Sequence, residues 1–109
     1  MISKELKWSA TEKKIARSAF DLALKNEMTK LKIELCQKVS KTMTNKEVWA
    51  LEEFLSKYRK DFDNKYDYRY SQLLRVFGIL IYEGFISLDD LEGLADDKIE
   101  AIKIFSSVR

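Results

Sequence analysis

The stretch SATEKKIARSAFDLALKNEMTKLKIELCQKV, residues 9–39, contains neither proline nor glycine and opens with a Ser-x-x-Glu motif. Ser9 and Glu12 are spaced to form a capping box, which predicts that a helix begins here. No helix breaker precedes Thr44, so the helix is expected to run for about 35 residues, or on the order of 50 Å. Since a compact chain of this size has a radius of gyration of about 13 Å, such a helix would extend beyond its own domain.

Apolar residues recur along one face of this predicted helix, at Phe20, Leu24, Met28, Leu31, Leu35 and Val39. A second apolar face in the N-terminal half carries Ile15, Ala19 and Leu22. A helix that is apolar on two sides is covered on two sides. Either the segment breaks near Asn26 and folds back within one chain, or a long helix packs against a second copy. We favour the second interpretation, a homodimer whose stem contains Leu24, Met28, Leu31 and Leu35.

A second helix is predicted from about Asn45 to Asp63, because Thr44 and Glu47 repeat the capping box. Its apolar stripe consists of Val48, Leu51, Leu55, Tyr58 and Phe62, with Phe54 on its flank. Together with the first helix it makes up a region of dimerising long helices, at about residues 9–63.

Trp49 does not belong to the apolar stripe of the second helix. At about 100° per residue it projects from another side, near Glu52 and Glu53, with Arg59 at the edge of the stripe. A large indole among charges is a candidate contact residue for a partner. The alternative is a partly exposed tryptophan that packs on the lysine stems of its own chain.

The stretch NKYDYRYSQLLRVFG, residues 64–78, alternates tyrosines with charged residues, as a half-buried strand would. The same run continues with helical spacing through Tyr66, Tyr70, Leu73, Phe77, Leu80 and Ile81. The spacing therefore predicts a third helix from Tyr66 or Asp67 to Glu83, with Gly84 as its C′ residue.

Tyr68 falls on the other side of this third helix, together with Arg75, Ile79 and Tyr82. Mixed aromatic, aliphatic and guanidinium groups are enriched in the cores of interfaces, although a helix buried on both sides within its own fold gives the same pattern. Tyr68 is kept as a candidate partner contact. Phe77 is a second candidate in this region, although its place on the buried stripe favours a structural role.

The C-terminal part is predicted to consist of short helical pieces. Ser87 is placed to cap one of them, and Asp96 to cap a last helix from Asp97 to about Ser107 whose inward face carries Ile99, Ile102 and Phe105. The chain is thus predicted to be all-α, with residues 1–109 forming a single domain that has a long helical stem and a compact head at about residues 64–109.

The composition narrows the possible functions. The 109 residues include 20 Lys and Arg against 18 Asp and Glu, a net charge of +2 that argues against a dedicated nucleic-acid binder. The absence of histidine excludes histidine-based catalysis and zinc binding. No apolar run is long enough to span a membrane, and no secretory signal is visible. We expect a cytoplasmic protein that binds no metal or cofactor and is not an enzyme, with its one cysteine, Cys36, as a small core residue.

Residues 48–102 resemble the fluorescence recovery protein family of cyanobacteria. The resemblance is carried by four segments: VWALEEFLSKYR at 48–59, KYDYRYSQLLRVFG at 65–78, EGFIS at 83–87 and LEGLADDKIEAI at 91–102. It implies an all-helical dimer with a stem and a head. It also implies a non-enzymatic regulator that binds photoactivated orange carotenoid protein, chiefly at its C-terminal domain, and speeds its return to the resting form. Photoprotective quenching at the phycobilisome would thereby end, which implies a cytoplasmic location that can reach the thylakoid surface through phycobilisomes.

The resemblance also implies which residues bind. The functional helix of the family carries Trp, then a His-Asp pair three residues on, then Arg. Trp49 and Arg59 match this pattern, whereas Glu53 stands where the family has Asp and Glu52 stands where many members have His. These four residues are expected at or beside the dimer interface, and Tyr68 and Phe77 in the head. The departures would also suit a dimeric adaptor of the same family with a different protein partner, in a bacterium that lacks the carotenoid system.

Overall fold

The computed structural model describes residues 7–107, which fold into four α-helices and one short 3-10 helix without any strand. In chain order the elements are α1 Ala10–Lys38, α2 Asn45–Lys65, α3 Leu73–Tyr82, the 3-10 helix η1 Leu88–Leu91 and α4 Asp96–Ser107. The predicted all-α class is confirmed.

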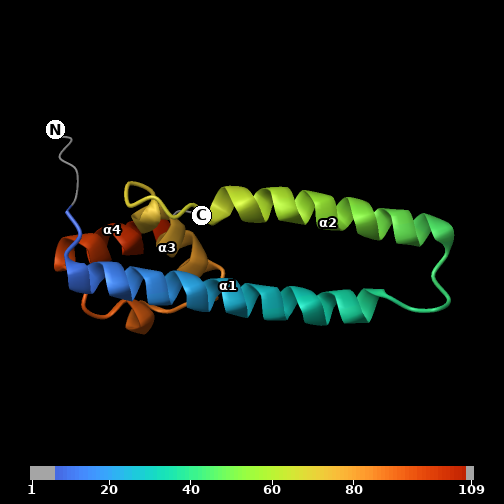
Figure 1. Cartoon of the computed structure of the whole chain (residues 1–109), viewed down its shortest axis with the longest axis horizontal. Helices are drawn as coiled ribbons and strands as arrows, with labels where there is room; N and C mark the ends of the chain where they lie inside the picture. The colour runs from blue at the N-terminus through green and yellow to red at the C-terminus, as the bar shows by residue number, and fades with distance from the viewer. Residues whose placement is uncertain (1–6, 108–109) are drawn as a thin grey trace.

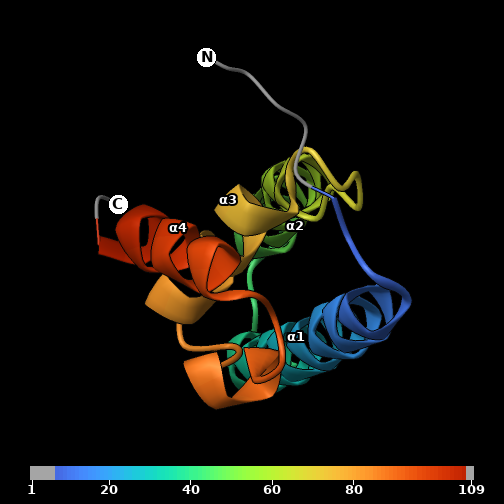
Figure 2. The same cartoon turned by 90° about the vertical axis from the view of Figure 1, so that its left-hand side faces the viewer.

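The molecule is elongated because α1 and α2 form a long antiparallel hairpin with the other elements gathered at one end (Figure 1). Its extents are 55 × 26 × 23 Å and its radius of gyration is 17.1 Å, compared with about 13 Å for a compact chain of this size. The view along the hairpin shows α3 and α4 beside the N-terminal half of α1 (Figure 2). The hairpin therefore extends beyond the rest of the fold, as the length of the first helix predicted.

Both predicted capping boxes are present. The Ser9 hydroxyl accepts a hydrogen bond from the Glu12 backbone at 3.1 Å, and the Glu12 carboxylate accepts one from the Ser9 backbone at 3.0 Å. Thr44 and Glu47 repeat this arrangement at the start of α2. The suggested break near Asn26 does not occur, because α1 continues to Lys38 and the chain reverses at residues 39–44.

The third helix starts later than predicted. α2 continues to Lys65, and residues 66–72 are not α-helical. In this segment the rings of Tyr66 and Tyr68 both pack edge-to-face on Phe20 of α1, with centroids 5.4 and 4.8 Å apart. In a helix, residues two positions apart point to different sides. The irregular segment instead brings both rings to one residue of α1. Aromatic packing between distant segments therefore prevails over the local helical spacing.

The hydrophobic core lies between α1 and the C-terminal elements. From α1 it receives mostly small side chains, which let the helix approach the others closely: Ala16, Ala19, Phe20 and Ala23. The C-terminal elements contribute larger ones: Leu73, Val76, Phe77, Leu80, Phe85, Ile86, Leu91, Leu94 and Ile102. Asn26 adds a polar connection, since its amide donates to the Phe85 carbonyl at 2.8 Å.

Two glycines are required by the packing and the end of α3. A Cβ added at Gly78 would overlap with the Cβ of Phe105 in α4, so glycine permits the close approach of these two helices. Gly84 has φ +85° and occupies the predicted C′ position of α3. There the Phe85 backbone donates to the Leu80 carbonyl at 2.9 Å, which closes a Schellman motif.

Several side chains are more exposed than the sequence predicted. Ile102 is buried in α4 as predicted, but Phe105 is 38% exposed even though its Cβ lies close to Gly78 of α3. Cys36 is exposed rather than in the core. Leu22, assigned to a second apolar face, is exposed as well.

A buried ion pair joins the start of α1 to α4. The Glu12 carboxylate accepts hydrogen bonds from the Ala95 backbone at 2.8 Å and from Lys98 at 3.2 Å, while Lys98 also donates to the Lys7 carbonyl at 2.7 Å. The backbone donors of Ser9 and Ala95, with Lys98 beside them, lower the pKa of Glu12 from 4.5 to about 2. The ionised carboxylate of Glu12 therefore stabilises the folded state.

We expect Glu12→Gln to lower the free energy of unfolding by roughly 2 kcal/mol at neutral pH, through loss of charge-assisted hydrogen bonds. Because folding depresses the pKa of Glu12 to about 2, the stabilisation is complete above about pH 4.5 and is lost as the pH falls towards about 2. Urea unfolding at several pH values should show the two proteins converging below about pH 4.5.

Glu100→Gln is the matched control, because the ion pair that Glu100 makes with Lys103 in α4 is exposed. It should change the free energy of unfolding by less than about 1 kcal/mol. A deficit in Glu12→Gln that stays constant down to about pH 3 would contradict the assignment.

Candidate functional site

The outer face of α2 carries the most exposed aromatic side chain of the described residues. No residue of α2 is buried, and Trp49 is 67% exposed. Glu52 and Glu53 lie one turn further along the same face. An exposed indole beside charged groups is the type of residue that contributes most to protein–protein binding.

The charged residues of this face have few partners in the chain. Glu52 accepts a hydrogen bond from the Ser56 hydroxyl at 2.8 Å. The Arg59 side chain is 84% exposed, and its Nε lies 3.6 Å from Asp63 in the next turn. Such exposed i, i+4 pairs contribute only about 0.3–0.5 kcal/mol, so the guanidinium is readily available to another molecule.

The structure separates the predicted site residues into two groups. Trp49, Glu52, Glu53 and Arg59 are exposed on one helix, with Trp49 and Arg59 about 15 Å apart along its axis. Tyr68 is half-buried in the irregular segment against Phe20, so its predicted place on the outward face of a helix was wrong.

Phe77 lies in the core between α3 and the other elements, with no exposed surface. The structural role that its stripe favoured is the one observed, and this side chain is not on the surface that a partner would meet. Arg75 and Ile79, which were grouped with Tyr68, line a cleft between α2 and α3.

Within the hairpin, an apolar groove of about 320 Å³ runs between α1 and α2. It is lined by Met28, Leu31, Leu55, Tyr58, Arg59, Phe62 and Asp63. Of the predicted stem residues, Leu31 is buried, Leu24 and Leu35 are half-buried and Met28 is 37% exposed. The hairpin by itself therefore leaves part of its apolar surface in contact with solvent.

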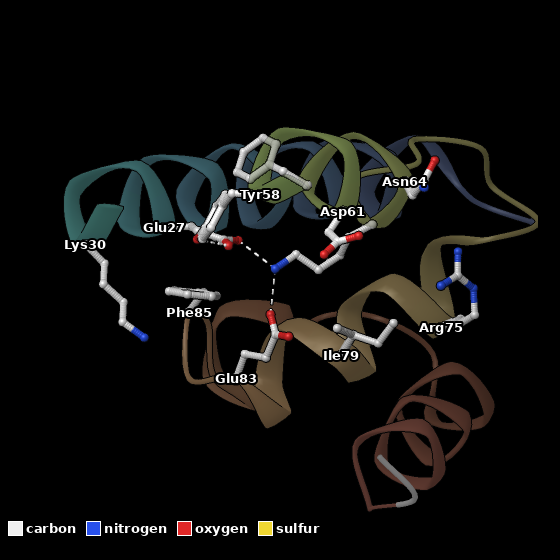
Figure 3. A pocket seen from close by; sticks show the side chains of 11 residues that line it. Glu27, Lys30, Tyr58, Asp61, Asn64, Arg75, Ile79, Glu83 and Phe85 are labelled. Atoms are coloured by element: carbon white, nitrogen blue, oxygen red, sulfur yellow. Dashed lines mark hydrogen bonds and ion pairs between the residues drawn. The ribbon is translucent and has the colours of Figure 1, made fainter. Parts of the chain in front are cut away.

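A polar cluster occupies the junction of hairpin and head. Glu27 of α1 is only 3% exposed and accepts hydrogen bonds from the hydroxyls of Tyr58, at 2.6 Å, and Tyr66, at 2.8 Å. Lys65 lies between two carboxylates, 2.8 Å from Glu27 and 2.6 Å from Glu83 (Figure 3). The cluster therefore joins α1, the end of α2 and the end of α3.

The protonation states in this cluster follow from its geometry. Burial opposes the ionisation of Glu27, but hydrogen bonds from Lys65, Tyr58 and Tyr66 outweigh it and lower the pKa of the carboxyl. Burial and the neighbouring carboxylate raise the pKa of both tyrosines. Glu27 is thus an anion that receives three donors.

Aromatic rings connect this cluster to the head. The row runs through Phe54, Tyr58, Phe62, Tyr66, Phe20, Tyr68, Tyr70 and Trp8, with successive centroids 4.5 to 6.4 Å apart. Arg17 adds a cation–π contact to Tyr68 at 4.8 Å. The irregular tyrosine segment is therefore the link between α2 and the head.

Glu27 and its partners were not among the site residues predicted from the sequence, although a signal was present. The buried face of α1 runs through Ala16, Ala19, Ala23 and Leu31, with Glu27 in the same i, i+4 row. A single carboxylate within an apolar stripe indicates a buried acid that must find donors. The predicted stripe through Leu24 and Met28 was displaced by about one residue and passed over it.

Comparison with known proteins identifies the family. Residues 8–106 match the sequence model described as photoprotection regulator fluorescence recovery protein. The chain belongs to this family. The fluorescence recovery protein of Synechocystis sp. PCC 6803 is 34% identical over 99 residues, which cover 91% of each chain. Members of the family are regulators of photoprotection.

Solved structures of the family share the fold. The fluorescence recovery protein of Fremyella diplosiphon superposes with a TM-score of 0.86 at 37% identity, over 92% of this chain and 98% of that one. The Synechocystis protein gives the same score and coverage at 33% identity. The all-helical architecture is therefore that of the fluorescence recovery proteins. Across residues 7–107, the structure has no helix that is apolar over the length needed to cross a membrane.

Proposed function

We propose that this chain binds photoactivated orange carotenoid protein, chiefly at its C-terminal domain, and accelerates its return to the resting form. Quenching at the phycobilisome would end as a result, at the cytoplasmic side of the thylakoid. The proposal rests on family membership over residues 8–106 together with the exposed Trp49 and Arg59 on one helix. The activity needs no cofactor and no covalent chemistry, and neither nucleic acid nor membrane insertion takes part.

The acceleration would come from binding alone. A protein that holds separated domains close to their docking geometry lowers the barrier only through contacts that strengthen in the transition state. Trp49 and Arg59 are of the residue types that dominate such contacts, and both are accessible in this fold. Release of the resting form requires that these contacts weaken once docking is complete.

We expect a stoichiometric excess of the chain to accelerate dark recovery of photoactivated orange carotenoid protein, measured by absorbance. Trp49→Ala should weaken binding by roughly 30-fold, since hot-spot residues contribute about 2 kcal/mol or more. Tyr82→Ala is the matched control, because Tyr82 is an aromatic residue of the head with 58% exposure, and it should change binding by less than about threefold.

An unchanged recovery rate with the wild-type chain would overturn the proposed function. It would favour the alternative that the same α2 face binds a different protein. Glu52 is the feature that supports this alternative, because it places a negative charge where the resemblance implies a histidine.

We also propose that the hairpin forms a homodimer. Half-buried and exposed apolar side chains continue along both of its helices, from Met28 and Leu35 in α1 to Val48 and Leu55 in α2. A second copy would cover this surface, and contiguous exposed apolar surface of this kind typically marks an interface.

Met28→Glu should lower the dimer affinity by at least tenfold, because a charge would enter an apolar interface. The measurement is light scattering over a dilution series. Ile104→Glu is the control, since Ile104 is 63% exposed on α4 in the head, and it should leave the mass unchanged. A monomer in the wild-type chain at every concentration would contradict the dimer.

The outer face of α2 is complementary to itself. Glu52 and Glu53 precede Ser56 by four and three residues, and Arg59 and Lys60 follow it by three and four. Two antiparallel copies of α2 related by a two-fold axis at Ser56 would therefore place each carboxylate opposite a cation. Such an isologous arrangement is the usual one in dimers.

Charge exchange tests this register. Glu53→Arg alone and Arg59→Glu alone should each weaken the dimer by roughly tenfold, because like charges then face each other across the axis. The double variant should restore wild-type affinity in analytical ultracentrifugation. Glu100→Arg makes the same reversal on the head and should have no effect. Single variants that dimerise normally would exclude this register.

A further inference from the structure

α2 has few connections to the rest of the chain. Within residues 7–107 the closest backbone packing is between α3 and α4, and α1 packs on η1 and α3, whereas α2 has no comparable backbone packing with another element. The orientation of α2 must therefore depend on side chains at its two ends and along the apolar groove.

At the hairpin turn, the connection is weak. Lys38 lies 4.9 Å from the ring of Phe54, and both line a surface hollow next to residues 39–44. An exposed cation–π contact contributes about 0.5–1 kcal/mol. The turn thus joins α1 to α2 without fixing their angle firmly.

At the head end, the connection converges on one carboxylate. Glu27 receives hydrogen bonds from Tyr58 and Tyr66, which lie two turns apart at the end of α2, and a third from Lys65 between them. Lys65 also contacts Glu83 at the end of α3. With the acid removed, three half-buried donors from one stretch of chain would lose their shared acceptor, and only Lys65 would keep a second carboxylate, that of Glu83.

The same residues lie in the aromatic row. Phe62 and Tyr66 are 4.5 Å apart, and Tyr66 contacts Phe20 of α1 at 5.4 Å. The hydroxyls of Tyr58 and Tyr66 thus point to Glu27, while the rings of the row pack against α1 and against one another. Ring packing alone would allow the rings of α2 to slide along α1. Hydrogen bonds to a fixed carboxylate allow only one position of α2.

We infer that Glu27 is a positioning residue, which fixes the orientation of α2 relative to the head through Tyr58, Lys65 and Tyr66. Its importance for partner binding rests on the proposed function, because α2 also carries Trp49, on the face opposite Tyr58, and Arg59, at the edge of the groove. Glu27 is buried and does not itself contact the partner protein. It sets where the binding face lies with respect to the head.

Glu12 provides a matched comparison. It is also a buried glutamate of α1 that contacts a lysine, but its partners are Ala95 and Lys98 in and before α4. Removal of its charge loosens α1 from the head and leaves the contacts of α2 intact. The two variants Glu27→Gln and Glu12→Gln therefore make the same chemical change at two different connections.

The test is hydrogen exchange, followed by mass spectrometry, on the full chain at neutral pH. In Glu27→Gln the backbone amides of residues 45–65 should exchange at least about tenfold faster, with α3 and α4 unchanged, since local opening follows the lost contacts. Glu12→Gln should show the reverse, with faster exchange in α4 and an unchanged α2. Tyr66→Phe should reproduce the Glu27→Gln pattern more weakly, because it keeps the ring and loses the hydroxyl.

An unchanged α2 in Glu27→Gln would overturn the inference, as would equal acceleration throughout the chain. If Glu27→Gln does not fold, Tyr58→Phe and Tyr66→Phe decide by the same criterion. Dark recovery measured with the same variants separates this inference from the proposed function. If wild type fails to accelerate recovery while Glu27→Gln still loosens α2, the proposed function fails and the positioning role of Glu27 stands.

Discussion

In this fold α1, a helix of 29 residues, is longer than the head that packs against it. The head covers the N-terminal half of α1, where alanines allow close approach. The other half continues with α2 as a hairpin that has an incompletely covered apolar groove. This mismatch in length produces the elongated shape and the surface on which both proposed interactions depend.

Two buried carboxylates lie at the ends of the covered part of α1. Glu12 receives backbone amides and Lys98, and Glu27 receives two tyrosines and Lys65. Burying a charge is costly unless donors surround it, so each acid can occupy only the position in which its donors converge. The pair therefore fixes α1 against α4 at one end and against α2 and α3 at the other.

The chain belongs to the fluorescence recovery protein family, whose members are regulators of photoprotection. Regulation through protein binding, as proposed here, needs an accessible surface whose position is well defined. In the single chain the outer face of α2 is accessible, because α2 has no buried residue. Its position depends on the junction, where the irregular tyrosine segment and the Glu27 cluster connect it to the head.

The sequence by itself determined the helices that have strong local signals. Capping boxes at Ser9 and Thr44 located both long helices, and the exposure of Trp49 followed from its position off the apolar stripe. Only the tertiary structure decided the path of residues 66–72 and the donors of Glu27, because both depend on contacts with Phe20 and α1 between residues far apart in the chain. Helical spacing predicts only which residues are neighbours within a turn or two. The donors of a buried carboxylate and the contacts of an aromatic ring depend on how the whole chain folds.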